Sequence, residues 1–253
     1  MENSLYEMIY KRKSFHLFRD VGDEKISLKE LNNIKEKYKD LKPLIDGIKT
    51  DIKIVPANKT TCARGEEYCI LLYSEIKENY LQNVGYIGEQ LDLYLTSLNI
   101  GTLWFGIGKT DEPQYNDLDF VIMIGIKKVP EDKFRKDMFK SKRKSLDEIW
   151  INDYYYNIGN IVRFAPSSCN TQPWIVESNE KELKVYRYKK PGKRGIMPID
   201  KVTYYNKIDI GIFLLFLDLT LEHENIEYKK EIYNDSKVND ETEKTLFAVY
   251  HIK

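Results

Sequence analysis

The chain has 253 residues, and its 40 Lys and Arg residues are balanced by 40 Asp and Glu, so the formal net charge is zero. This balance excludes the strongly basic character of most nucleic-acid-binding proteins, and the longest apolar run, residues 210–217, is too short for a transmembrane helix. Three cysteines without a CxxC pair, and an N-terminus that does not resemble a signal peptide, predict a cytoplasmic protein with reduced thiols.

The first half of the chain predicts alternating helices and strands. Ser-x-x-Glu pairs at residues 4–7 and 27–30 fit the capping box of a helix start. Apolar spacing after the second pair predicts one buried helical face. The later patterns predict strands at 51–55 and 69–75, a helix at 85–99 that ends before Gly101, a glycine-rich loop at 101–108 and a buried strand at 119–126.

The second half repeats this order. A third Ser-x-x-Glu pair, at residues 145–148, predicts a helix that runs through residue 162. The patterns that follow predict a Pro-Ser loop at 165–174, strands at 174–178 and 182–188, a long apolar helix at 209–223 and a strand at 226–233.

Two landmarks recur at one spacing: Pro43 and Pro166 are 123 residues apart, and so are Gly88 and Gly211. The common spacing favours an internal duplication, with one half at residues 1–144 and the other at 145–253. The alternative is coincidence, because many α+β chains share this order of elements.

The stretch "RFAPSSCNTQPW" at residues 163–174 stands out in a chain rich in lysine, tyrosine and isoleucine. A turn would explain its Pro, Ser and Asn residues. A surface for a flat, polar-edged ligand would also explain them, because small side chains allow close approach and an amide offers both donor and acceptor. The Gln-Pro-Trp ending is not required by a turn and favours the ligand surface.

Three motifs resemble those of the nitroreductase-like FMN flavoproteins. They are "RKSFHLF" at 12–18, "APSSCNTQPW" at 165–174, and the run from "LNIGTLWFGIG" at 98–108 through "DFVIMIGI" to "KRKSLDEI" at 142–149. The first and third motifs lie mainly in one half and the second in the other. The chain is therefore similar to a tandem subgroup that resembles a fused dimer, and the resemblance implies an α+β fold of antiparallel sheets flanked by helices.

The resemblance also implies one FMN between the two halves. Arg12 and Arg143 would bind the phosphate, with Ser14 nearby, so Arg12→Ala would remove most of the FMN affinity. The alternative for the two Lys-Arg-Lys-Ser segments is a pair of solvated helix ends. Gln172 would bond the flavin or brace the loop. The implied cofactor-binding residues are Arg12, Lys13, Ser14, His16, Leu103, Trp104, Phe105, Gly106, Arg143, Pro166, Ser167, Ser168, Asn170 and Gln172.

His16 departs from the family pattern, which commonly has Lys or Arg near the N1–C2=O edge of the flavin. An unperturbed histidine titrates at about 6.5, so we hypothesise that flavin reduction depends on pH near neutrality. The equally plain alternative is a solvent-exposed histidine beside a helix end.

The implied activity is hydride transfer from NAD(P)H through FMN to a nitroaromatic, a quinone or a similar acceptor. No side chain need act as acid or base, and Cys62 and Cys69 with the three histidines lack metal-site spacing. The alternatives are a flavin-binding protein without turnover and a tyrosine-rich interaction domain. We expect a small-molecule acceptor as partner, no nucleic acid or membrane, and a monomer, since a fused pseudo-dimer has no need to pair.

Overall fold

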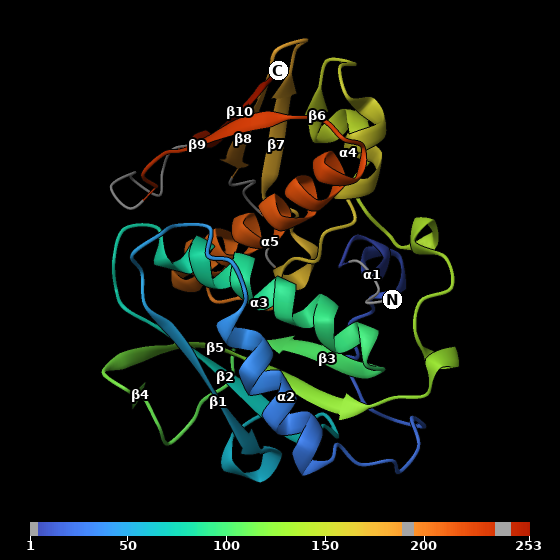
Figure 1. Ribbon diagram of the computed structural model, residues 1–253, viewed down its shortest axis with the longest axis vertical. Coiled ribbons are helices and arrows are strands. Elements are labelled where there is room, and N and C mark those ends of the chain that lie inside the picture. Colours follow the sequence, from blue (N-terminus) through green and yellow to red (C-terminus); the bar gives the residue numbers. More distant parts are fainter. Residues whose placement is uncertain (1–4, 189–194, 236–243) are drawn as a thin grey trace. The chain divides into compact units, whose positions relative to one another are not determined.

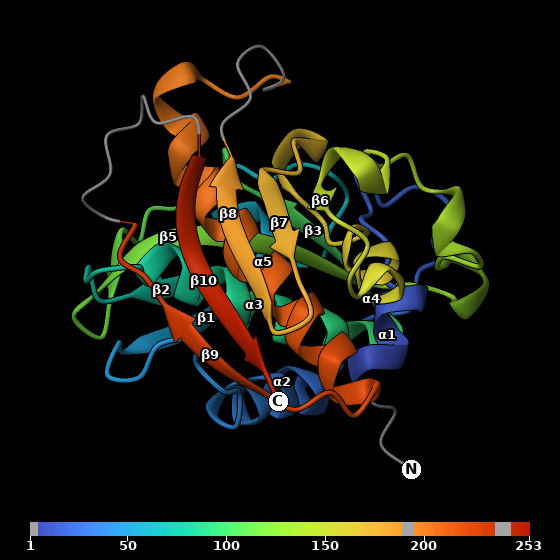
Figure 2. The ribbon, with the colours of Figure 1, turned by 90° about the horizontal axis from the view of Figure 1, so that it is seen from above.

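The computed structural model describes residues 5–188, 195–235 and 244–253. The chain divides into two compact units (Figures 1 and 2). Unit 1 consists of Met1–Tyr80 and Ile87–Met138, and unit 2 of Leu81–Tyr86 and Phe139–Lys253. The capping box expected at residues 4–7 begins outside the described residues.

Unit 1 is built around a five-stranded sheet with the order β1-β2-β5-β3, to which β4 adds a short pairing with β5. Helix α3 covers one face, where a β-carbon on Gly88 would lie 2.6 Å from the ring of Trp104 and 3.4 Å from Leu72. The other face carries a core that includes Phe15, Phe18 and Met123. The elements of this half are α1 (Leu5–Lys11), α2 (Leu28–Lys39), β1 (Thr50–Pro56), η1 (Ala57–Lys59), β2 (Tyr68–Ser74), α3 (Tyr80–Ser97), β3 (Ile100–Phe105), β4 (Gln114–Tyr115), β5 (Leu118–Lys128), η2 (Glu131–Lys133) and η3 (Met138–Lys140).

Unit 2 has a second five-stranded sheet, in the order β6-β7-β8-β10-β9, and its long helix α5 runs along one face (Figure 2). Trp174 of β7 stacks on Phe213 of α5 with ring centroids 4.7 Å apart. The elements are η4 (Leu146–Glu148), β6 (Trp150–Ile151), α4 (Tyr156–Val162), η5 (Ser168–Asn170), β7 (Trp174–Ser178), β8 (Glu182–Tyr188), η6 (Ile199–Lys201), α5 (Val202–His223), β9 (Tyr228–Ile232) and β10 (Lys244–Ile252).

The apolar run at 210–217 lies inside α5 and is buried, as the sequence predicts. Among the described residues, no helix combines the length and apolar character needed to cross a membrane.

The two sheets have the same topology. In unit 1 a strand pair, β1 and β2, is followed by the long helix α3 and then by β3 and β5. In unit 2, β7 and β8 are followed by α5 and then by β9 and β10. In both sheets the fourth of these strands lies between the second and the third. The α+β fold with two similar halves is therefore confirmed.

Two glycines allow α3 and α5 to approach each other closely. A β-carbon on Gly211 would lie 1.9 Å from the carbonyl oxygen of Gln82, and one on Gly85 would lie 2.1 Å from that of Ile208. The two contacts are reciprocal. Gly85 lies three residues after Gln82, whose carbonyl Gly211 contacts, and Gly211 lies three residues after Ile208, whose carbonyl Gly85 contacts. Gly85 is therefore the structural counterpart of Gly211, in place of the Gly88 expected from the 123-residue spacing.

Gly211→Ala is expected to lower the free energy of unfolding by about 1–3 kcal/mol, because the added methyl would overlap a backbone carbonyl. Helix propensity alone would raise the free energy of unfolding, because alanine is more favourable than glycine inside a helix by about 1 kcal/mol. Urea unfolding of the variant beside Asn33→Ala, a change on the exposed face of α2, checks this. A Gly211→Ala protein as stable as the wild type would contradict the close approach.

Three sequence expectations are corrected by the structure. Residues 101–105 of the expected loop belong to β3 (Ile100–Phe105), which pairs with β5. The helix expected from 145 to 162 is interrupted, because only a 3-10 turn follows the Ser145–Glu148 capping box and α4 begins at Tyr156. Strand β10 has no counterpart among the predicted elements.

Candidate functional site

Arg12, the expected phosphate ligand, is buried in unit 1 with 3% of its surface exposed. Its Nε donates a hydrogen bond to Oδ2 of Asp92 at 2.9 Å, and the same nitrogen lies 3.2 Å from Oε1 of Glu89. Both carboxylates belong to α3 and are fully buried. Burial raises the pKa of Glu89 well above its usual range, against the opposing effect of Arg12. The guanidinium is thus engaged by two acids of its own unit.

Asp92 also ties α3 to β3. Its carboxylate accepts hydrogen bonds from Oγ1 of Thr102 at 2.6 Å and from Nε1 of Trp104 at 2.9 Å. Together with Arg12, these donors surround one buried acid. The Trp104 side chain, expected near a flavin, therefore serves as an internal hydrogen-bond donor.

The segment after Arg12 pairs with the outer edge of β3. Ser14 forms a parallel bridge with Thr102, whose carbonyl accepts the N–H of Phe15 at 2.9 Å. The backbone groups of residues two apart in a strand point to the same side. The N–H of Trp104 therefore points to the edge of β3 at which the carbonyl of Thr102 accepts the N–H of Phe15. Four residues are expected near N5 of the flavin. Leu103, Trp104 and Phe105 lie in β3, and Gly106 directly follows the strand.

Two further residues of the N-terminal motif lie at the surface. Lys13 is exposed, and its Nζ donates to the carbonyl of Lys133 at 3.0 Å. His16 is also exposed, and its place at the flavin edge stays a prediction.

The Pro-Ser loop of unit 2 is an irregular, internally braced segment. Three of its residues, Cys169, Asn170 and Gln172, have left-handed backbone angles with φ between 48° and 55°. Such angles are uncommon outside glycine and asparagine. Oγ of Ser167 accepts the N–H of Gln172 at 2.9 Å, which closes the loop on itself.

The basic segment at 142–144 is fastened to this loop. Arg143 donates to Oδ1 of Asn170 at 3.0 Å, and the backbone N–H of Lys144 donates to Oε1 of Gln172 at 2.8 Å. The amide nitrogen of Gln172 in turn donates to the carbonyl of Asn170 at 3.2 Å. With 2% of its surface exposed, Gln172 braces the loop, which was one of its two expected roles. Trp174, at the end of the loop, belongs to the core.

An acid that the sequence motifs did not reveal lies beneath the loop. Oδ1 of Asp209, on α5, accepts the backbone N–H of Ser168 at 3.0 Å and its hydroxyl at 3.2 Å. Oδ2 has no hydrogen-bond partner among the described residues. Burial raises the pKa of Asp209 from 3.8 to about 7. The available signal was an acid directly before the apolar run at 210–217.

The structure therefore gathers the predicted residues within each unit. In unit 1, Arg12, Ser14 and the β3 residues are neighbours through Asp92 and Thr102. In unit 2, Arg143 contacts the loop that carries Pro166, Ser167 and Ser168, which are partly exposed and offer no long side chain.

Comparison with known proteins gives one family. A family model described as "Putative TM nitroreductase" matches residues 4–221. A solved structure described as a "putative nitroreductase" from Thermotoga maritima MSB8 is 20% identical, with 100% of this chain and 95% of that chain covered and a TM-score of 0.63. Another, from Desulfovibrio desulfuricans and described as a "putative nitroreductase in complex with fmn", is 16% identical over 61% of this chain and 99% of that one, with a TM-score of 0.45.

No match is found among curated proteins. The likeness to the Thermotoga structure shows that the two chains share a fold. The family model covers most of the sequence, and the chain belongs to the nitroreductase family that this model describes.

Proposed function

We propose that the chain is an FMN-dependent oxidoreductase, which passes a hydride from NAD(P)H through FMN to a nitroaromatic, a quinone or a similar acceptor. The observation that carries the proposal is the braced Pro-Ser loop, with Arg143 fastened to it, in a member of the nitroreductase family.

The residues of this loop fit a flat aromatic ligand. Pro166, Ser167 and Ser168 are small and partly exposed, so a ring can lie against them. The hydrogen bonds from Ser168 to Asp209 and from Gln172 to Ser167 hold the loop in one shape before any ligand binds. A preformed surface lowers the entropy cost of binding.

The phosphate role is assigned to Arg143 rather than to Arg12. Arg143 is partly exposed, and its guanidinium is oriented by Asn170 and by the carbonyl of Phe164 at 3.3 Å. Arginine binds phosphate well because its planar guanidinium donates several parallel hydrogen bonds. Arg12 is buried and paired with Asp92, which makes it a poor partner for another anion.

When bound, FMN would supply the hydride-accepting group, as flavins do. The chain's own residues then bind and orient it: the loop supports the ring, Arg143 holds the phosphate, and Asn170 offers an amide to a polar edge. The roles expected for Lys13, Ser14, His16 and the 103–106 segment remain predictions from the family resemblance.

The absorption spectrum of the purified protein, with identification of the released chromophore, tests the proposal. We expect about one FMN per chain, reduced by NAD(P)H in a stopped-flow experiment. Bound FMN that NAD(P)H does not reduce would favour a flavin-binding protein without turnover. A protein that retains no flavin after FMN is added would overturn the proposal.

Arg143→Ala is expected to weaken FMN binding by about 10- to 100-fold, since hydrogen bonds to a charged group contribute about 1.5–3 kcal/mol. Fluorescence titration of the flavin-free protein measures the dissociation constant. Lys229→Ala, which removes an exposed cation on β9, is the matched control for net charge. Equal affinities of the two variants would assign the phosphate to another residue.

A further inference from the structure

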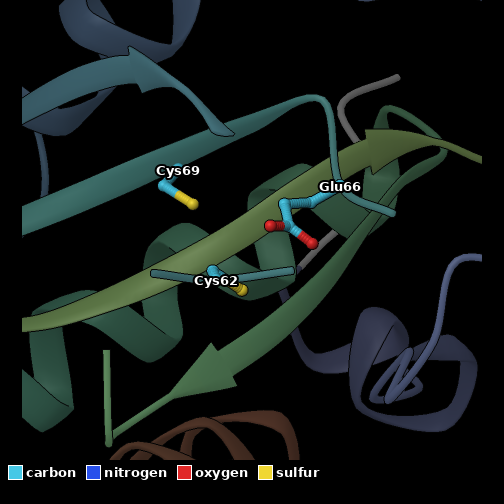
Figure 3. A group of neighbouring side chains, drawn as sticks. All are labelled: Cys62, Glu66 and Cys69. Atoms are coloured by element: carbon cyan, nitrogen blue, oxygen red, sulfur yellow. The ribbon is translucent and has the colours of Figure 1, made fainter. Parts of the chain in front are cut away.

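Unit 1 contains a cluster of two thiols and a carboxyl group that the family resemblance does not use. Cys62 and Glu66 lie in the loop between η1 and β2, and Cys69 is near the start of β2. Figure 3 shows the three side chains as neighbours. One ligand atom from each lies within 4.8 Å of the others. All three residues are buried, with 4%, 8% and 0% of their surfaces exposed.

The sheet leaves room for this cluster. Cys69 pairs with Gly125 across the β2–β5 ladder. A β-carbon on residue 125 would lie 3.3 Å from Cγ of Glu66 and 3.5 Å from Sγ of Cys62. The absence of a side chain at this position lets the loop fold over the strand and bring Glu66 and Cys62 to Cys69.

The loop is held in place at both ends. The N–H of Thr61 donates to the carbonyl of Lys109 at 3.0 Å, and the N–H of Glu67 donates to that of Ile126 at 2.9 Å. Oγ1 of Thr60 accepts the N–H of Cys62 at 3.2 Å and lies 3.3 Å from Sγ of Cys69. The three potential ligands are thus oriented by neighbouring groups, as the ligands of metal sites usually are.

The carboxyl group of Glu66 is only half satisfied. Oε2 accepts the N–H of Arg64 at 2.8 Å, whereas Oε1 is buried without a hydrogen-bond partner among the described residues. Buried carboxylate oxygens normally have a donor or a cation beside them. The neighbouring thiols are weak donors, so they compensate this oxygen poorly.

We propose that Cys62, Glu66 and Cys69 bind a divalent cation that prefers thiolate ligands, with Zn²⁺ as the best match. Thiolates select such metals over Mg²⁺ and Ca²⁺, which take oxygen ligands. Zn²⁺ binds sulfur at about 2.3 Å in tetrahedral geometry, so three protein ligands leave one position for water. Binding releases the protons of the two thiols to solvent and involves no change of oxidation state.

This inference is independent of the proposed flavin chemistry, and its test reads the metal directly. The full-length protein is freed of metal with a chelator and a reductant and then titrated with Co²⁺. We expect one Co²⁺ per chain, a thiolate-to-cobalt charge-transfer band, visible bands of tetrahedral cobalt, and loss of both on addition of Zn²⁺.

The variants separate the proposed ligands from other thiols. Cys62→Ser and Cys69→Ser should each lower the intensity of the charge-transfer band to about half or less, since one of the two thiolates is lost, and Glu66→Gln should weaken Co²⁺ binding by at least about tenfold. Cys169→Ser, at the exposed cysteine of unit 2, is the matched control and should bind as the wild type does. Circular dichroism identifies any variant that has failed to fold, and Glu66→Gln, which leaves both cysteines in place, gives a second test.

Three results would overturn the proposal. The first is a wild-type protein without the charge-transfer band, and the second is a band of undiminished intensity in Cys62→Ser. The third is a thiol count, made after denaturation without reductant, of one thiol per chain instead of the three cysteines of the sequence. That count would make Cys62 and Cys69 a disulfide pair.

Discussion

Replacing Arg12 by alanine is expected to lower the free energy of unfolding by about 3–5 kcal/mol, the usual cost of breaking a buried ion pair. The variant removes the cation that pairs with Asp92 and lies beside Glu89, and leaves Arg135 as a second cation that acts on both acids. Burial already favours the protonated, neutral form of Glu89, so the larger share of the cost is expected from Asp92, which loses its 2.9 Å ion pair. Urea unfolding followed by circular dichroism measures the change.

Lys13→Ala is the matched control, because it removes the neighbouring cation from an exposed position. It should change stability by less than about 1 kcal/mol. The double variant Arg12→Ala/Asp92→Asn should recover part of the loss, because it removes the carboxylate that Arg12 pairs with. An Arg12→Ala protein of wild-type stability with greatly weakened FMN binding would return Arg12 to the phosphate role implied by the family resemblance.

The second large effect is a pH dependence of stability that arises from Asp209. Its pKa in the folded protein is about 7, against an ordinary value of 3.8. Below about pH 4 the acid is protonated in both states and has no effect. Between about pH 4 and 7 the unfolded chain loses this proton first, so stability falls as pH rises, by about 4 kcal/mol in all.

Asp209→Asn should remove this contribution. Urea unfolding at several values of pH measures the free energies of unfolding of both proteins. As the pH rises from about 4 to 7, the wild-type value should fall relative to that of Asp209→Asn. Asp153→Asn, at an exposed position in the same unit, should show no such shift. A wild-type minus Asp209→Asn difference that stays constant from pH 4 to 8 would show that the buried acid is ionised throughout.

The sequence predicted the elements whose signals are local. Strands β1, β2, β5, β7 and β8 lie close to their expected positions, and the Ser27–Glu30 capping box is formed. Helices α3 and α5 begin five and seven residues earlier than expected, at Tyr80 and Val202. Neither has a side-chain cap, so the sequence carries no marker of its first turn.

The missed strands lack the alternation of polar and apolar residues that identifies a strand. Four consecutive residues of β3, Ile100–Leu103, are buried, and so are four of β10, Phe247–Tyr250. Gly101 also suggested a helix end, although its place in β3 brings it against Val129 and Phe15. A run buried on both sides cannot be told from other apolar segments by its period.

The candidate site was predictable where a motif is continuous in the chain. The loop at 165–174 follows from its motif, which left two roles open for Gln172, whereas the acids that surround Arg12 lie 77 and 80 residues away on α3. Asp209 is likewise remote from the loop it supports. The group of Cys62, Glu66 and Cys69 fits no familiar ligand spacing, because a bent loop and a strand together bring its members into contact.

Helix α3 is divided between the two units, with Leu81–Tyr86 assigned to unit 2 and Ile87 onward to unit 1. Within unit 2, Gln82 bonds to Asp235 at 3.1 Å and Tyr86 bonds to Asp218 at 2.7 Å. A chain cut between residues 144 and 145 would deprive the C-terminal fragment of both donors and of the helix turn that Gly211 accommodates. Because one helix thus contributes residues to the cores of both units, we expect the protein to unfold in a single cooperative step.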